Sequence, residues 1–374
     1  MKKTLLTICL VWMCFSLSAQ KIIDLSGKWS FCIDRQDNGE KEKWFSHTLN
    51  DFINLPGSMP EKLKGDEVTA KTQWTGSLYD SSYYYNPYME KYRKEGNIKF
   101  PFFLTPDKHY VGAAWYQKEV NIPADWKGER ILLFLERPHI ETTVWVNGQK
   151  TGMQNSLCVP HQYDITHYVR PGKCTITIRV DNRIKEINVG PDSHSITDQT
   201  QGNWNGIVGR ICLQTTPKTY FDDIQIYPEP EQKLARVKVV IKGTGTAKVK
   251  LSAESFNTDK KHIVPAIQQE IKLNKGVTET EMVLPMGNDM LLWDEFHPAL
   301  YKLKAEVTNG KKTEIKEIQF GMRRFEIKGK WFYVNGRKTQ LRGTVENCDF
   351  PLTGYAPMDV ESWERVFRIC RSYG

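Results

Sequence analysis

Asn203, Trp204 and Asn205 form a short run of side chains that together are able to bind a sugar. A tryptophan ring stacks on the C–H face of a sugar, while amide groups hydrogen-bond its hydroxyls. The alternative is that Trp204 packs between domains. We favour packing for Trp204, because large aromatic side chains are mostly buried.

A second aromatic stretch runs from Gln73 to Tyr110. Tyrosine suits carbohydrate because its ring is apolar and its hydroxyl is polar. The alternative is a long insertion whose rings pack on the neighbouring fold, although a loop of this length without a function is uncommon. The aromatic residues of the stretch are Trp74, Tyr79, Tyr83, Tyr84, Tyr85, Tyr88, Tyr92, Phe100, Phe102 and Phe103.

The sequence contains none of the common motifs for several other kinds of catalysis and binding. It has no Ser-His-Asp order, phosphate loop, dinucleotide fingerprint or His-Glu-x-x-His metal motif. The cysteine spacing matches no disulfide framework or zinc site, and Cys174 continues an alternating apolar set, which favours a buried small side chain. We therefore predict no metal and no cofactor, and structural roles for His139, His161, His167 and His194.

The pattern of residues 1–19 is typical of a secretory signal peptide. Lys2 and Lys3 precede an apolar run from Leu5 to Leu17 that is too short to span a bilayer. We expect an exported protein, periplasmic or extracellular, with no membrane segment after signal removal. The net charge of +8 is spread along the chain without a basic stripe, so nucleic acid is not an expected partner.

The elements that would position these side chains are mainly β. Residues 20–217 show many short strands broken by Gly, Pro and Asn, which predicts a jelly-roll β-sandwich. Thr143–Val146 ends at Asn147 and Gly148, the residues that a type I′ hairpin turn requires. Residues 218–322 alternate regularly, and about seven strands over that length predict an immunoglobulin-like sandwich.

Residues 323–374 change character. The stretch contains Trp331–Val334, an Asn335-Gly336 turn, Leu341–Thr344 and then a helix whose expected N-cap is Asp359. A strand, a polar loop and an amphipathic helix predict the first βα unit of a parallel α/β fold. The apolar helix face needs a sheet to cover it, and the resemblance described next implies that this stretch is the start of a truncated (β/α)8 barrel.

These stretches resemble glycoside hydrolase family two, which includes β-galactosidases, β-glucuronidases and β-mannosidases. Val334–Arg337 followed by Leu341–Thr344 is similar to the entry of its catalytic barrel. Leu25–Phe31 resembles the opening of its sugar-binding domain, Asn203–Arg210 a later part of that domain, and Pro298–Leu303 a part of its second domain. The resemblance covers nearly the whole chain after the signal, and it implies a β-linked carbohydrate as the partner.

The resemblance also says where catalysis takes place. Family members that retain configuration use two Glu residues about 5 Å apart, both on later barrel strands. The chain therefore has no predicted catalytic residue, and we expect it to be inactive alone. Substrate contacts are implied for Asp198, Gln199, Glu346 and Asn347, where Asn347 replaces a His found in some relatives. The alternative is a non-catalytic carbohydrate-binding or adhesion protein of two β-sandwiches.

Overall fold

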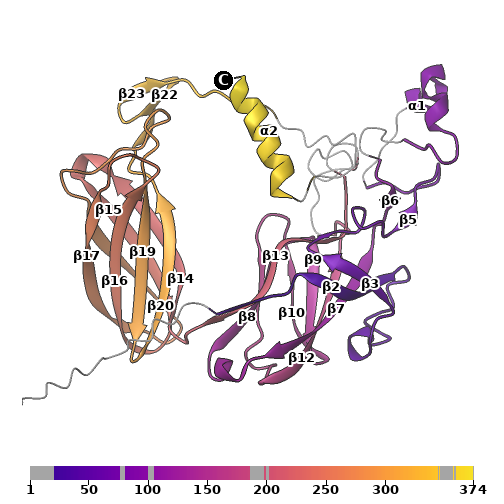
Figure 1. The fold of residues 1–374 in the computed structure, drawn as a ribbon, viewed down its shortest axis with the longest axis horizontal. Coiled ribbons are helices and arrows are strands. Elements are labelled where there is room, and N and C mark those ends of the chain that lie inside the picture. The colour runs from indigo at the N-terminus through magenta and orange to yellow at the C-terminus, as the bar shows by residue number, and fades with distance from the viewer. Residues whose placement is uncertain are drawn as a thin grey trace, which may run out of the picture. The chain divides into compact units, whose positions relative to one another are not determined.

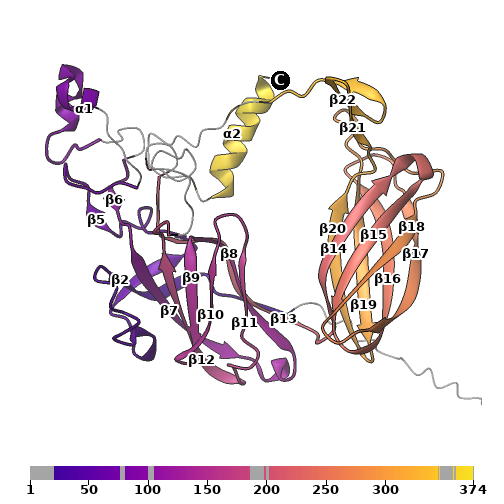
Figure 2. The ribbon, with the colours of Figure 1, turned by 180° about the vertical axis from the view of Figure 1, so that it is seen from behind.

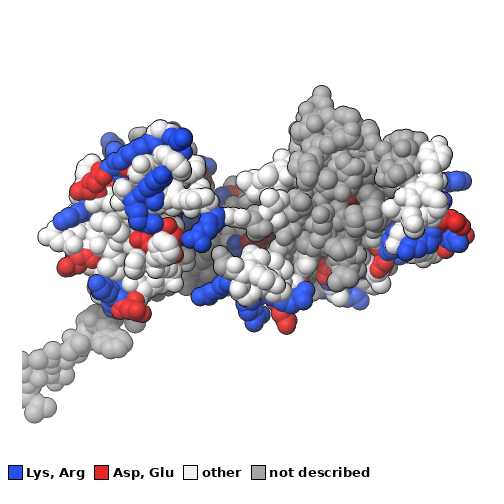
Figure 3. Space-filling model, turned by 90° about the horizontal axis from the view of Figure 1, so that it is seen from above, with Lys and Arg blue, Asp and Glu red and all other residues white. Residues whose placement is uncertain are grey.

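The computed structural model describes residues 21–75, 81–99, 105–185, 198, 202–343, 345, 357 and 359–373. Strands dominate it (Figure 1), so the prediction of a mainly β chain is confirmed. Within the described residues, no helix has the length and apolar character needed to cross a membrane. On the face shown in Figure 3, Lys and Arg occur beside Asp and Glu.

The first β-sandwich lies within residues 22–215 and has two sheets around one core. One sheet has the strand order β1-β13-β8-β11, with β4 also paired to β13. Its strands are β1 (Ile22–Asp24), β13 (Gly206–Thr216), β8 (Arg130–His139), β11 (His161–Asp164) and β4 (Gly57–Ser58).

The other sheet of the first sandwich has the order β10-β9-β12-β7-β2-β3 and is antiparallel throughout. Its strands are β10 (Gln149–Asn155), β9 (Glu141–Val146), β12 (Gly172–Asp181), β7 (Ala113–Ile122), β2 (Gly27–Asp34) and β3 (Asp51–Leu55). Alternate residues point into the core, as Ile176, Ile178 and Val180 of β12 do. Cys174 lies in the same row at 1% exposure, which confirms the prediction of a buried small side chain.

The outer face of this second sheet is also partly covered. Residues 35–50, which we call the outer strap, cross it and include the 3₁₀ helix η1 (Trp44–Ser46). Leu49, Trp44 and Phe45 of the strap pack against Trp115 and Trp145 of the sheet, which are almost fully buried. The sheet is therefore apolar on one side and mixed aromatic and polar on the other, where the strap covers Trp115 and Trp145 while Lys173 and Glu119 stay exposed.

The Tyr-rich stretch forms a separate small structure. Strands β5 (Asp66–Glu67) and β6 (Lys108–His109) pair antiparallel, and between them lie α1 (Ser81–Tyr85) and the 3₁₀ helix η2 (Pro87–Tyr92). Tyr83 is 5% exposed and its hydroxyl donates to the Tyr92 carbonyl at 2.7 Å, whereas Tyr85 and Tyr88 are 78% and 85% exposed. Tyr79, Phe100, Phe102 and Phe103 lie outside the described residues.

The second sandwich lies within residues 216–341 and has its own core. Its sheets have the orders β14-β15-β18 and β17-β16-β19-β20, and Figures 1 and 2 show them from opposite sides. The seven strands agree with the predicted immunoglobulin-like pattern. They are β14 (Tyr220–Glu229), β15 (Leu234–Lys242), β16 (Gly245–Phe256), β17 (Ile263–Leu273), β18 (Val277–Pro285), β19 (Leu300–Asn309) and β20 (Lys312–Phe320).

Residues 325–339 form a three-stranded antiparallel sheet of β21 (Phe325–Lys328), β22 (Trp331–Val334) and β23 (Arg337–Thr339). The Asn-Gly turns close as predicted, with φ of 51° and 79° at Asn335 and Gly336 and of 50° and 78° at Asn147 and Gly148. These are the positive values that type I′ hairpin turns need.

The predicted βα unit of a barrel is not confirmed. Strand β22 pairs antiparallel on both sides, and residues 341–343 form no strand. A parallel strand needs a neighbour that exchanges backbone hydrogen bonds with it, and none of the described residues provides one here. The helix α2 (Val360–Ser372) does form. It is capped by Asp359 as predicted, and none of its described residues is buried.

Gly206, at the start of β13, provides a test of how tightly the first sandwich closes. A Cβ added there would lie 2.8 Å from the Ser58 Cα and against the Gly57 carbonyl, whereas one added at Gly172 would meet nothing within 4 Å. Both glycines have positive φ, at 150° and 110°, so both Gly→Ala changes strain the backbone. We expect Gly206→Ala to lower the free energy of unfolding by about 1–3 kcal/mol more than Gly172→Ala in urea titrations. Equal decreases in the free energy of unfolding would show that strands β4 and β13 move apart to accommodate the added methyl group.

Candidate functional site

The end of β12 sends consecutive side chains to opposite sides of its sheet. Arg179 and Asp181 point to the outer face, whereas Asn182 follows Ile178 and Val180 on the core side. Asp181 and Asn182 are both 0% exposed. Each is the centre of a separate polar network, and the two networks hold the loops at this end of the sandwich.

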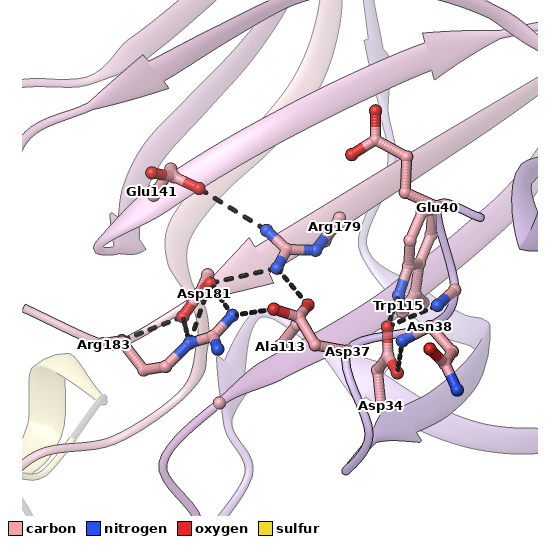
Figure 4. Close-up of polar contacts among 12 residues, drawn as sticks. Asp34, Asp37, Asn38, Glu40, Ala113, Trp115, Glu141, Arg179, Asp181 and Arg183 are labelled. Carbon is pink, nitrogen blue, oxygen red and sulfur yellow. Dashed lines mark hydrogen bonds and ion pairs between the residues drawn. The ribbon is translucent and has the colours of Figure 1, made fainter. Parts of the chain in front are cut away.

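The outer network, which we call the charge cluster, consists of Asp37, Glu141, Arg179, Asp181, Arg183 and Lys185. Figure 4 labels all of these residues except Lys185. The Arg179 guanidinium donates to Asp37 at 2.6 Å and to Asp181 at 3.1 Å. Arg183 donates to the same two carboxylates, at 2.7 and 2.6 Å, and Lys185 reaches Asp181 at 2.8 Å. The cluster thus fastens the outer strap, through Asp37, to the end of β12.

These ion pairs control the ionisation of the carboxyl groups. Burial by itself would raise the pKa of Asp181, but hydrogen bonds from Arg183 and Lys185 outweigh it and hold the pKa well below its usual range. Burial opposes ionisation of Asp37 too, and hydrogen bonds from Arg179 and Arg183 lower its pKa. A carboxyl group that acts as a general acid at neutral pH needs a raised pKa. These two carboxylates therefore have a structural role and do not donate protons.

The inner network, which we call the amide cluster, consists of Asn182, Asn203 and Asn205. Asn182 accepts from the Gly112 backbone at 2.8 Å and donates to the Asn203 side chain at 3.1 Å. Asn205 donates to the Gly112 carbonyl at 2.9 Å and accepts from the Tyr116 hydroxyl at 2.8 Å. Three amides with little or no exposure therefore satisfy backbone groups that would otherwise be buried without partners.

Asp198, a predicted substrate contact, is tied to this network. It is 2% exposed, and its carboxylate accepts from the backbone N–H groups of Thr75 and Asn203, each at 2.5 Å. His109 Nε2 lies 3.4 Å from it. Asp198 thus joins the start of the Tyr-rich stretch to the loop that carries Trp204. Its neighbour Gln199 lies outside the described residues, and the substrate role of both stays a prediction.

Trp204 is half-buried beside the amide cluster, and its ring meets the edge of His139 with 4.5 Å between centroids. Enclosure by neighbouring groups, together with the positive charge of Arg137, lowers the pKa of His139 to about 3. The imidazole is therefore neutral at neutral pH and gives Trp204 an uncharged partner. Both suggested roles of Trp204 stay predictions, and Glu346 and Asn347 lie outside the described residues.

The charge cluster was not predicted from the sequence. Asn203 and Asn205 were expected to be able to bind a sugar, but both are buried, and their amide groups donate to groups within the protein. A signal for both clusters was present, because the alternating set Ile176, Ile178 and Val180 ends directly in Asp181, Asn182 and Arg183. Three strongly polar residues after a core strand indicate buried anchoring of the following loop. The partner Asp37 lies 142 positions from Arg179 and carries no such signal. Among the described residues, no group of His, Cys, Asp and Glu is placed to hold a metal ion.

Comparison with known sequences decides the family. The sequence profile "Glycosyl hydrolases family 2, sugar binding domain" matches residues 22–217, and the profile "Glycosyl hydrolases family 2" matches residues 219–323. The chain belongs to glycosyl hydrolase family 2. The first match includes both the charge cluster and the amide cluster.

Several curated family 2 enzymes resemble the chain. A putative beta-glucuronidase of Formosa agariphila is 29% identical over 265 residues, which is 69% of this chain and 31% of that protein. The beta-glucuronidase of Paenibacillus borealis is 23% identical over 90% of this chain and 51% of its own length. The beta-galactosidase of Thermoanaerobacter pseudethanolicus is 25% identical over 70% and 35%. The chain therefore spans about half or less of the length of these relatives.

A solved structure supports the fold. The b-glucuronidase from Ruminococcus gnavus in complex with D-glucuronic acid superposes with a TM-score of 0.65 at 19% identity. The superposition covers 94% of this chain and 54% of that one. The two proteins thus share the fold of their β-sandwich domains.

Removing the Arg179 side chain tests the structural role of the charge cluster. Arg179 is 8% exposed, and Arg179→Met leaves Asp181 buried with fewer cations. We expect the free energy of unfolding to fall by about 3–5 kcal/mol. Arg210→Met is the matched control, because Arg210 pairs with Glu136 while its own side chain is 74% exposed, and we expect a loss below about 1 kcal/mol. Similar small losses in both variants would contradict this role.

Lowering the pH should weaken the charge cluster. The pKa values of Asp37 and Asp181 are lowered in the folded chain, so their stabilisation is present above the unfolded pKa of about 3.9 and lost as pH falls below it. We expect urea stability to drop more steeply between about pH 5 and pH 3 in the wild type than in Asp181→Asn. Parallel pH profiles for the two proteins would show that Asp181 does not contribute.

Proposed function

We propose that this chain forms the sugar-binding and immunoglobulin-like portion of an exported β-glycosidase, an enzyme that hydrolyses O-glycosyl bonds. The observation that carries the proposal is the match of two family 2 profiles to adjacent segments, residues 22–217 and 219–323. The relatives named beta-glucuronidase and beta-galactosidase support a β-linked glycoside as the substrate of the whole enzyme. Export rests on the signal-like residues 1–19.

The chain by itself is proposed to be inactive. Retaining glycosidases need a pair of carboxyl groups about 5 Å apart, one of which is protonated before bond cleavage. In the charge cluster, Asp37 and Asp181 have lowered pKa values and are held by cations, so they do not meet this requirement. The resemblance noted from the sequence places both catalytic Glu residues on barrel strands, which neither matched segment contains.

Asp198 and Trp204 are proposed to serve the substrate in different ways. Asp198 accepts two backbone hydrogen bonds and is almost fully enclosed, so we assign it to holding the loop that precedes Trp204. Trp204 keeps part of its surface exposed and is the described side chain of this loop most suited to meet a sugar ring. The substrate contact predicted for Asp198 is retained as a proposal beside this role, together with those of Gln199, Glu346 and Asn347.

An assay of glycoside hydrolysis tests the proposal that the chain is inactive by itself. The purified chain should not release nitrophenol from nitrophenyl β-D-glucuronide or nitrophenyl β-D-galactoside, because it lacks the acid and the nucleophile. Sustained turnover of either compound would contradict the proposal.

The coding DNA provides the second test. We expect the reading frame to continue past Gly374 and to encode an Asn-Glu pair about a hundred residues on, within a barrel of about 250 residues. A stop codon there would instead favour the adhesion alternative.

A further inference from the structure

A pocket of about 310 Å³ lies on the outer face of the first sandwich. It is bounded by strap residues 45–48, by Gln117 of β7 and Thr175 of β12, and by the turn between β9 and β10 at Asn147 and Gly148. The volume is at the lower end of the range for small-molecule sites. It suits a ligand the size of one sugar ring.

One wall of the pocket is a fixed aromatic ring. Phe45 stacks on Trp145 with 5.2 Å between centroids and 6° between planes, and Trp145 in turn lies 5.0 Å from Trp115. Both tryptophans are at most 2% exposed, so the rings behind Phe45 are held by the sheet. A preset aromatic surface of this kind stacks on the C–H face of a sugar without first having to be ordered.

The backbone around the pocket is fixed by hydrogen bonds. Gln117 Nε2 donates to the His47 carbonyl and to Thr177 Oγ1, each at 3.1 Å. The Asn147 side chain accepts from the Thr175 backbone at 2.9 Å, and the Asn147 backbone donates back to the Thr175 carbonyl at 2.8 Å. These bonds hold the strap and the hairpin against the sheet, so the pocket is preformed.

Several polar side chains of the pocket remain available. The hydroxyls of Ser46, Thr48 and Thr175 and the His47 ring form no hydrogen bond within the part of the chain that the structure describes, although the backbone beside them is paired. Among these described lining residues there is no Lys, Arg, Asp or Glu. Uncommitted hydroxyls next to an aromatic ring, in a lining without charged side chains, fit a ligand that is neutral and rich in hydroxyl groups.

We infer that this pocket is an accessory binding site for a neutral pyranose residue of a glycan. The inference rests on the proposed function in one respect, namely that the first sandwich contacts carbohydrate. It goes further by naming the residues and the charge class of the sugar. The site has no carboxylate in its lining, so it holds a sugar unit without cleaving it.

Calorimetric titration of the whole chain tests the inference. The probes are methyl β-D-galactopyranoside, methyl β-D-glucopyranoside and sodium D-glucuronate. We expect at least one neutral glycoside to bind with a Kd of about 1–10 mM, more tightly than glucuronate. Thr175→Val, which keeps the side-chain shape, should raise that Kd at least about threefold, and Phe45→Ala at least about tenfold. Thr246→Val on the second sandwich is the control, since Thr246 is exposed and outside the pocket, and it should leave Kd unchanged.

Each outcome supports or contradicts the inference. If binding survives both Phe45→Ala and Thr175→Val, the sugar does not bind in this pocket. If glucuronate binds as tightly as a neutral glycoside or more tightly, the site does not prefer a neutral sugar. If no neutral glycoside binds up to about 100 mM, the inference fails, while the nitrophenyl glycoside assay and the coding DNA still test the proposed function separately. Near-ultraviolet circular dichroism checks folding. If Phe45→Ala does not fold, the double variant Ser46→Ala with Thr175→Val gives the result.

Discussion

The first sandwich depends on how β12 ends. Asp181 and Asn182 are adjacent, fully buried and polar, and the alternation of a strand sends them to opposite sides of the sheet. A buried carboxylate is tolerated only when cations surround it, and a buried amide only when its hydrogen bonds are made. Both requirements are met by segments distant in sequence. The end of one strand therefore fixes where the outer strap and the loops around Gly112 and Asn203 lie.

This arrangement explains why the strap covers part of the outer side of the sheet. The core side buries aliphatic residues, while the outer side buries two tryptophans beneath Trp44, Phe45 and Leu49. Aromatic packing holds the middle of the strap, and Asp37 holds its beginning through Arg179 and Arg183. Hydrogen bonds of Gln117 and Asn147 and the stacking of Phe45 on Trp145 then hold the walls of the pocket in place.

Local signals in the sequence predicted a large part of the fold. Asn147-Gly148 and Asn335-Gly336 define hairpin turns through φ values that few other residue pairs adopt, and the alternation of Ile176, Ile178 and Val180 shows the inner face of β12. The mainly β class followed from such patterns, whereas the family followed from the resemblance of motifs such as Asn203–Arg210. The helix after Asp359 was also predicted, because its cap and its apolar spacing are local properties.

The remaining features depended on distant contacts. Trp145, Arg179 and Asp181 alternate with core residues and so look solvent-facing, until the strap residues 35–50 are known to cover them. The two backbone donors to Asp198 come from Thr75, 123 positions away, and from Asn203, and no local pattern predicted these contacts. Residues 341–343 have the composition of a barrel strand but form none, since pairing of parallel strands is not a local property.

The central claim is that two separate networks at the end of β12 hold two different sets of loops. Hydrogen exchange measured by mass spectrometry on Asp181→Asn and Asn182→Ala tests it most directly. The account predicts faster exchange in strap residues 35–50 for Asp181→Asn and faster exchange around Gly112 and Asn203–Asn205 for Asn182→Ala, each with little change in the other region. The same pattern of faster exchange in both variants would contradict it.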